Sequence, residues 1–349
     1  MVQLPQKMII VFMWNDPELI KLFLDKTPLI DVRAPIEFQD GAIPHSINLP
    51  LMNDEERRQV GICYKQSGQG AAIELGHQLV CGELKEARVE SWRNYIQQYP
   101  EAEVFCFRGG LRSQISCQWL KETGISKNPI PGGYKRLRHF FLSILNDAPL
   151  PKMIRLGGLT GSGKTLLLEK IPYHLDLEKL ANHRGSAFGP RGNQPSQITF
   201  ENKLALELLK LTGKKVLIED ESATIGQLTV PQRLFSTLRE TPMIILETGH
   251  EERLQNIFNE YVRHSSRDFF LSGLGKIQKR LGGVKFKLLS DEIGKAFESP
   301  MELAFHEAWI SILLKEYYDP LYQKGIRYNQ DKILFQGNQA EVLTYLSQI

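Results

Sequence analysis

The stretch KMIRLGGLTGSGKTLLLEKIP, residues 152–172, decides the fold of the second half of the chain. Its apolar run, Met153 to Leu156, predicts a buried strand. The glycine-rich loop Gly157 to Gly163 leads from that strand into a predicted helix that begins at Lys164 and ends near Pro172. Residues 158–165 fit the pattern G-x-x-x-x-G-K-[ST] in the strand, loop, helix context that a phosphate-binding loop requires.

This loop predicts a site for a polyphosphate, because backbone amides cradle phosphate oxygens and a lysine neutralises them. Arg184 and Arg191 lie in a loop that could close over the phosphate, although surface positions are an equal alternative. A P-loop does not by itself specify ATP. The predicted diphosphate-binding residues are Gly158, Gly161, Ser162, Gly163, Lys164, Thr165 and Arg184.

The carboxylates that follow the next buried strand, Val216 to Ile218, are candidates for a metal site. Thr165 can hold Mg²⁺ together with a carboxylate from Glu219 or Asp220, and Glu221 stays open as an alternative. A solvated strand end is the competing interpretation.

The chain around the P-loop shows where the domains and their elements are expected. The breaks at Asp147 to Pro151 divide it into a first domain, 1–147, and a P-loop domain, 151–349. Strands that alternate with helices, including a strand at Met243 to Leu246, predict an α/β fold with mostly parallel sheets. From about residue 250 helical patterns take over, including a helix opened by a capping box at Ser299 to Glu302, so we expect a helical C-terminal subdomain.

The first domain carries a second chemical motif, VFCFRGGLRS at residues 104–113. The strand Val104 to Phe107 runs into a glycine-bearing loop and then a helix from Ser113 to Glu122. Nearby cations, inward-pointing amides and a helix N-terminus all favour a thiolate. We therefore predict a catalytic group of Cys106, Arg108 and Arg112, with loop amides aimed at the sulfur or at an anion beside it. The alternative is a small buried side chain at a strand end.

The motifs around this loop resemble those of the rhodanese family. The resemblance rests on DVR at residues 31–33, EF at 37–38, Gly41, IP at 43–44, Asn48 and Pro50, followed by the Cys106 loop. It implies a small rhodanese-like α/β domain with a parallel sheet, whose loop cysteine carries sulfur or selenium or binds related anions.

Composition agrees with an ordinary globular protein. At 349 residues, with 42% hydrophobic and 24% charged residues and a net charge of +3, disordered and fibrous classes are excluded. Four cysteines without a CxxC pair predict free thiols in a reducing compartment, and a metal site of Cys63, His77 and Cys81 is disfavoured. The apolar run Met8 to Trp14 is read as a strand rather than a signal peptide. No stretch is long enough for a membrane span, and we expect a cytoplasmic protein.

A rhodanese-like domain followed by a P-loop domain is the arrangement of the tRNA 2-selenouridine synthases, which the chain resembles over nearly its whole length. Stretches similar to that family are NLPLM 48–52, LGH 75–77, LVCG 79–82, GGYK 132–135, HRGS 183–186, FENKLA 200–205 and EYYDP 316–320. The resemblance implies a transferase that replaces sulfur by selenium in wobble 2-thiouridine of tRNA. Geranyl diphosphate first alkylates the sulfur, and selenophosphate then replaces the geranylthio group.

The resemblance also implies roles and partners. The P-loop with Mg²⁺ would stabilise the departing diphosphate, the Cys106 group would serve the selenium step, and selenophosphate synthetase is a candidate partner, with no permanently bound cofactor and no membrane. The predicted tRNA-binding residues are Arg263, Lys276, Lys279 and Arg280, within a basic stretch that also includes Arg253, Arg267, Lys285 and Lys287, and, at the domain junction, Lys135 and Arg136. Trp309, Tyr317 or Tyr318 could stack a base, but core packing is the favoured role.

Three other functions remain open. A sulfurtransferase could use Cys106 as a persulfide carrier while ATP at the P-loop activates tRNA. A regulatory RNA-binding module would not depend on Cys106, and a small-molecule kinase would depend on Lys164 but not on tRNA.

Overall fold

The structure, a computed structural model, describes residues 16–348, with the side chain of Arg327 left out. The strand predicted at Met8 to Trp14 lies outside these residues. The chain forms two compact units, and each is described by itself. The first holds residues up to Pro149 together with Pro195–Lys210, and the second holds Leu150–Gln194 and the residues from Leu211 onward.

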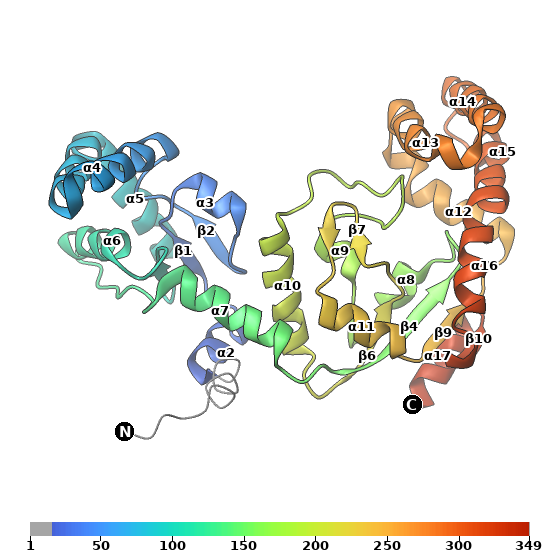
Figure 1. The fold of residues 1–349 in the computed structure, drawn as a ribbon, viewed down its shortest axis with the longest axis horizontal. Helices are drawn as coiled ribbons and strands as arrows, with labels where there is room; N and C mark the ends of the chain where they lie inside the picture. The colour runs from blue at the N-terminus through green and yellow to red at the C-terminus, as the bar shows by residue number, and fades with distance from the viewer. Residues whose placement is uncertain (1–15, 349) are drawn as a thin grey trace. The chain divides into compact units, whose positions relative to one another are not determined.

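A three-stranded parallel sheet forms the centre of the first unit (Figure 1). Its order is β2 (Ser46–Asn48), β1 (Leu29–Asp31), β3 (Glu103–Phe105). Among residues 16–149, the helices of this unit are α2 (Pro17–Leu24), α3 (Pro35–Asp40), α4 (Asp54–Leu79), α5 (Gly82–Gln98), α6 (Leu111–Glu122) and α7 (Gly133–Asn146). Helix α2 begins at Pro17, and the Asp16 carboxylate caps it by accepting from the Leu19 N–H.

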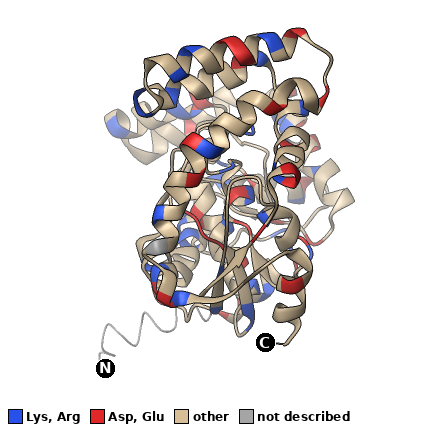
Figure 2. Cartoon of the chain, turned by 90° about the vertical axis from the view of Figure 1, so that its right-hand side faces the viewer, with Lys and Arg blue, Asp and Glu red and all other residues tan. Residues whose placement is uncertain are grey.

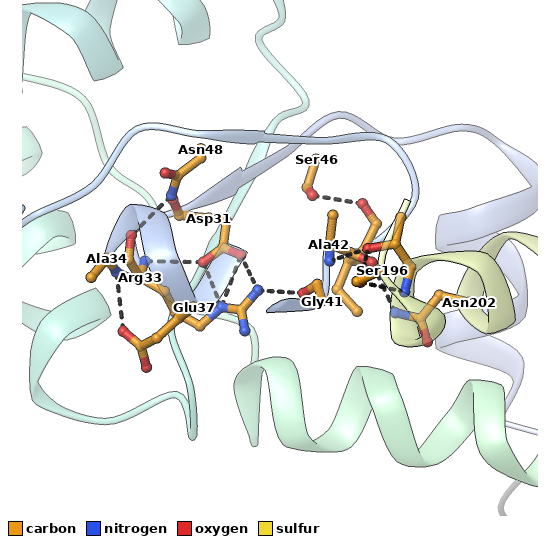
Figure 3. A network of polar contacts seen from close by, with 12 residues as sticks. Asp31, Arg33, Ala34, Glu37, Gly41, Ala42, Ser46, Asn48, Ser196 and Asn202 are labelled. Carbon is orange, nitrogen blue, oxygen red and sulfur yellow. Dashed lines mark hydrogen bonds and ion pairs between the residues drawn. The ribbon is translucent and has the colours of Figure 1, made fainter. Parts of the chain in front are cut away.

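A helix from the second half of the sequence completes the first unit. This helix, α10 (Gln197–Lys210), packs against α7. The Asn202 amide donates to the Ala42 carbonyl at 2.8 Å, and the Ala42 N–H donates to the Thr199 hydroxyl at 2.9 Å. Figure 3 shows Asn202 reaching the backbone at Ala42. The loop after α3 is therefore held by a segment about 160 residues away in the chain.

The second unit is built on a five-stranded parallel sheet of order β10-β9-β4-β6-β5. The strands are β4 (Lys152–Gly158), β5 (His174–Leu175), β6 (Lys215–Glu219), β9 (Met243–Leu246) and β10 (Ile333–Gly337). A small hairpin, β7 (Thr224–Ile225) and β8 (Leu228–Thr229), and the helices α8 (Lys164–Leu168), α9 (Leu177–Ala181), α11 (Gln232–Glu240) and α17 (Gln339–Gln348) accompany it. The predicted mixed α/β class with parallel sheets is confirmed.

Helices dominate the stretch after β9. They are α12 (His250–Glu260), η1 (Val262–His264), α13 (Arg267–Leu281), α14 (Gly283–Glu298), α15 (Leu303–Leu313), the π-helical turn Leu314–Tyr318, α16 (Asp319–Arg327) and η3 (Gln330–Lys332). Figure 1 shows the helices α12 to α16, in orange to red, gathered beside the strands of this unit. Their packed faces form one apolar cluster that includes Phe270, Ile293 and Trp309.

Two sequence predictions for this region were wrong. The predicted capping box at Ser299 does not open a helix, since Ser299 follows the end of α14 and α15 begins only at Leu303. The chain also returns to the sheet as β10, where only helices were predicted. Strand β10 pairs with β9 alone, so it is an edge strand with a half-exposed face, and its pattern does not stand out in the sequence. Within residues 16–348 no helix is both long and apolar enough to cross a membrane.

Candidate active sites

Cys106 lies directly after β3 and is almost fully buried, with 3% of its surface exposed. Its Sγ is 3.1 Å from the Ser113 hydroxyl and donates to the Gly110 carbonyl at 3.7 Å. In the described part of the chain no N–H donates to Sγ, so the first alternative, loop amides aimed at the sulfur, was wrong, while the second, amides aimed at an anion beside it, stays a prediction. The physical reason is the extended conformation of Gly110, which turns its carbonyl toward the thiol.

The loop nevertheless leaves a set of amides open beside the sulfur. Helix α7 holds two of its carbonyls, since the Tyr134 N–H donates to the Cys106 oxygen at 2.8 Å and the Lys135 N–H to the Phe107 oxygen at 3.0 Å. In residues 16–348 nothing accepts a hydrogen bond from the N–H groups of the first turn of α6, which are those of Leu111, Arg112 and Ser113. Unpaired amides at a helix N-terminus form an anion site.

Two arginines flank this cradle in different ways. The Arg112 guanidinium forms two hydrogen bonds with the Glu37 carboxylate, at 2.5 and 3.1 Å, and its charge also acts on Cys106. Burial works to raise the pKa of Glu37, but the hydrogen bonds and charge of Arg112 lower it on balance. Arg108 is exposed and lies near the ring of Phe107. The structure thus brings Arg112 to the sulfur and leaves Arg108 at the surface of the loop.

A buried ion pair organises the strand ends around the cradle. Arg33 donates to both oxygens of Asp31 and to the Gly41 carbonyl, which Figure 3 shows, and its guanidinium lies 3.7 Å from the centre of the Tyr134 ring. Burial raises the pKa of Asp31, and the hydrogen bonds of Arg33 oppose that shift. The pair therefore links β1 to α7, whose N-terminus holds the Cys106 loop.

The P-loop in the second unit resembles the Cys106 loop, because residues distant in the chain hold its carbonyls and several of its amides are unpaired. The Arg253 Nε–H donates to the Thr160 carbonyl at 2.8 Å, and the Asn256 amide donates to the Gly161 carbonyl at 2.9 Å. In the described residues the N–H groups of Gly161, Gly163, Lys164 and Thr165 have no acceptor. The Lys164 ammonium donates to the Gly158 carbonyl at 2.8 Å. These unpaired amides and the ammonium group are the kind of donors that a phosphate-binding loop offers to phosphate oxygens.

Of the three carboxylates at the end of β6, Glu219 contacts the P-loop through Thr165; burial raises the pKa of Glu221, and the Lys164 ammonium of the P-loop opposes that shift. The Thr165 hydroxyl donates to its Oε1 at 3.4 Å. Burial raises the pKa of Glu219 well above its usual value, and the charges of Glu178, Asp176 and Glu221 add to that shift. Burial and Glu221 likewise raise the pKa of Glu178 to about 8. The Lys164 and Arg191 charges oppose the shift at Glu178 without cancelling it, and buried carboxylates beside a hydroxyl fit a divalent cation.

Asp220 points elsewhere and is occupied by two arginines. Its Oδ1 accepts from Arg155 at 2.9 Å and from Arg239 at 2.7 Å. Within residues 16–348 no group of three or more His, Cys, Asp or Glu side chains is arranged to hold a metal ion. A Mg²⁺ ion at this site would therefore share Thr165, Glu219 and phosphate oxygens, which is how this ion is commonly bound.

The Arg184 guanidinium stacks on the Tyr261 ring at 4.4 Å and donates to the Glu260 carbonyl at 2.9 Å. Its charge also lowers the pKa of Glu260, although burial raises that pKa on balance. Arg184 is thus fixed beside α12, the same helix that anchors the P-loop, while Arg191 is exposed.

The predicted tRNA-binding residues fall into two groups. Arg136 is paired with Asp16 and Glu18, and neighbouring Lys135 is exposed. The predicted tRNA-binding residues of the second unit are all exposed, namely Arg263, Lys276, Lys279 and Arg280. Figure 2 shows basic and acidic residues mixed on the C-terminal helices. Arg253 is buried and paired with Asp319, and Trp309 is buried in the core, so neither faces solvent.

The prediction missed several residues of both sites. Ser113 was taken only as the start of a helix, Glu37 only as part of a motif, and Glu178 was not singled out. No local signal marks them, because each acquires its partner through the fold. The two residues that anchor the P-loop, Arg253 and Asn256, are 93 and 95 residues away from the carbonyls they hold.

Comparison with known proteins identifies similar chains. Residues 151–349 match the family described as the tRNA 2-selenouridine synthase AAA domain. A tRNA 2-selenouridine synthase of Pseudomonas savastanoi pv. phaseolicola (strain 1448A / Race 6) is 44% identical, over 95% of this chain and 97% of its own length. Those of Marinobacter nauticus and Psychromonas ingrahamii are 44% and 42% identical, each over 93% of this chain and 95% of its own length.

Proposed function

The chain belongs to the tRNA 2-selenouridine synthase family, a family of tRNA-modifying enzymes, and from this premise we propose that it replaces sulfur by selenium at C2 of wobble 2-thiouridine in two steps. The first step alkylates the thiocarbonyl sulfur with geranyl diphosphate. The second replaces the geranylthio group with selenium from selenophosphate. The observation that carries the proposal is the presence of two open amide cradles, one beside a thiol and one beside a lysine.

The P-loop serves the first step. The sulfur attacks C1 of the geranyl group, the C1–O bond breaks, diphosphate leaves with the bonding electrons, and the uridine loses its N3 proton. The amides of Gly161, Gly163, Lys164 and Thr165, together with the Lys164 ammonium, stabilise the charge on the leaving diphosphate. A Mg²⁺ ion on Thr165 and Glu219 would supply further charge neutralisation when bound.

The Cys106 cradle serves the second step. Selenium of selenophosphate attacks C2, the C2–S bond breaks, and geranylthiol leaves with a proton. Water then cleaves the P–Se bond, which releases phosphate and returns a proton to N3. The open amides of α6 and the Arg112 guanidinium suit the selenophosphate anion, and Cys106 either orients it or carries selenium covalently.

The experiment is mass spectrometry of wobble uridines after incubation of thiolated tRNA with the protein, geranyl diphosphate and selenophosphate, without ATP. We expect S-geranyl-2-thiouridine as the intermediate and 2-selenouridine as the product. Lys164→Ala should block both. Cys106→Ala should stop at the S-geranyl intermediate, whereas Cys117→Ala, which removes a buried thiol from the same apolar cluster, should keep both steps. Unchanged 2-thiouridine with the wild-type protein would refute the proposal, and sulfur transfer that requires ATP would favour the sulfurtransferase.

A further inference from the structure

A cavity of about 620 Å³ opens in the first unit, within the size range of small-molecule sites. It lies among α4, α6 and the segment that precedes α4. We call it the prenyl pocket and define it by its apolar lining, which includes Met52, Val60, Ile73, Leu111, Ile115 and Trp119. Cationic side chains join this lining, namely those of Arg57, Arg58, Lys65 and Arg112.

A break within α4 builds this pocket. Gly68 has φ of 81° and ψ of −175°, so the segment consists of two helical arms rather than one straight helix. Both arms contribute to the lining, the first with residues such as Val60 and Lys65 and the second with residues such as Ala72 and His77. Because only glycine adopts this backbone conformation without strain, the sequence itself specifies the break.

The pocket adjoins the Cys106 loop. Leu111 and Arg112 line it and directly follow the loop glycines, and the charge of Arg112 acts on the thiol. Met52 and Trp119 line the pocket and belong to the same apolar cluster as Cys106. A ligand group in the pocket would therefore be held next to the atoms that react at the cradle.

The lining also indicates what kind of group binds. Three of its large hydrophobic side chains remain substantially exposed, Ile62 at 41%, Tyr64 at 58% and Leu111 at 41%, which favours an apolar occupant. Lys65 is exposed and has no carboxylate partner within residues 16–348, so its ammonium is available to phosphates, whereas Arg57 pairs with Glu37 at 3.6 Å and Arg58 with Glu55 at 2.6 Å. An apolar floor with cations beside it suits an apolar group attached to a polyanion.

We propose that the prenyl pocket holds the geranyl group of S-geranyl-2-thiouridine while the cradle presents selenophosphate to C2. This inference rests on the proposed function and adds to it the part of the chain that recognises the intermediate. The pocket then receives the geranylthiol that forms when the C2–S bond breaks. Burial of each methylene is worth roughly a fourfold change in affinity, so a ten-carbon chain distinguishes the intermediate strongly from a short S-alkyl group.

The test compares selenation of two RNA substrates, one with S-geranyl-2-thiouridine and one with S-methyl-2-thiouridine, by mass spectrometry. For the wild-type protein we expect the larger kcat/KM with the geranyl substrate. Ile73→Trp fills the pocket and should reduce the geranyl-to-methyl ratio at least tenfold. Leu24→Trp, which changes an exposed apolar residue outside the pocket, should leave the ratio unchanged.

A second variant protects the test against misfolding. Ile115→Ala enlarges the pocket and should raise the ratio of S-farnesyl to S-geranyl conversion severalfold. If Ile73→Trp keeps the wild-type ratio, or if it inactivates the protein and Ile115→Ala leaves the farnesyl ratio unchanged, the pocket inference is wrong and another ligand occupies the cavity. If the wild-type protein converts none of these substrates, the proposed function itself fails.

Discussion

Gly133→Ala should damage the Cys106 loop from a position outside it. Gly133 has φ of 53°, and a Cβ there would lie 2.2 Å from the Cys106 carbonyl oxygen and 2.5 Å from the Gly109 nitrogen. Both contacts are with backbone atoms, so no side-chain rotation relieves them. The left-handed conformation costs alanine roughly 1–2 kcal/mol, and forced displacement of packed atoms costs roughly 1–3 kcal/mol more. We therefore expect the free energy of unfolding to fall by about 2–5 kcal/mol.

Gly124→Ala is the matched control. Gly124 lies in the same unit with φ of 89°, but a Cβ there would meet nothing within 4 Å. It should therefore lose only the conformational term of about 1–2 kcal/mol. Urea unfolding followed by tryptophan fluorescence measures both, and a difference of 2 kcal/mol would separate the midpoints by about 1 M for a slope of about 2 kcal/mol/M. If Gly133→Ala loses no more stability than Gly124→Ala and keeps selenation activity, the tight approach of α7 to the loop is not what holds Cys106 in place.

Three further outcomes are expected. Burial raises the pKa of Cys117 to about 11, so its thiolate fraction at pH 8 is about one in a thousand. Mass spectrometry after iodoacetamide treatment under native conditions should therefore find Cys117 unlabelled. Rapid labelling would contradict its burial. Arg253→Leu removes the partner of the Asp319 carboxylate and of the Thr160 carbonyl, so urea unfolding should show that the free energy of unfolding falls by about 3–5 kcal/mol. Calorimetry should show weaker diphosphate binding. Unchanged binding would show that this anchor does not shape the P-loop. The pKa of Glu37 is lowered from its usual 4.5, so its pairing with Arg112 stabilises the fold above that pH, and this contribution is lost as the pH falls below it. The difference in unfolding free energy between wild type and Glu37→Gln should therefore shrink below pH 4.5. A constant difference would argue against the pair.

The sequence predicted those features that depend on residues close together in the chain. The P-loop pattern, the Cys106 loop between β3 and α6 and the apolar strand at Met243 are all visible as patterns in contiguous residues. The strand β10 escaped prediction because an edge strand after a long helical stretch presents little continuous apolar pattern. The helical periodicity of α10 is plain in the sequence. Its place in the first unit could not be predicted, because it depends on contacts with Ala42 and Arg138.

The sequence could not predict which of Glu219, Asp220 and Glu221 contacts the P-loop. Side chains alternate direction along an extended segment, so neighbouring carboxylates face different surroundings. The sequence does not say which of them faces the P-loop. In the fold Glu219 meets Thr165 and Asp220 meets two arginines.

By itself the sequence determined that the protein has two glycine-bearing loops, each between a strand and a helix, because glycine spacing and the neighbouring strand are local properties. Only the tertiary structure decided which way each loop faces. Arg253 and Asn256 hold the P-loop carbonyls, α7 holds those of the Cys106 loop, and Glu37 positions Arg112, all across long separations in the chain. Such partners are selected by the packing of whole elements, which brings distant side chains within hydrogen-bonding distance only after the chain has folded.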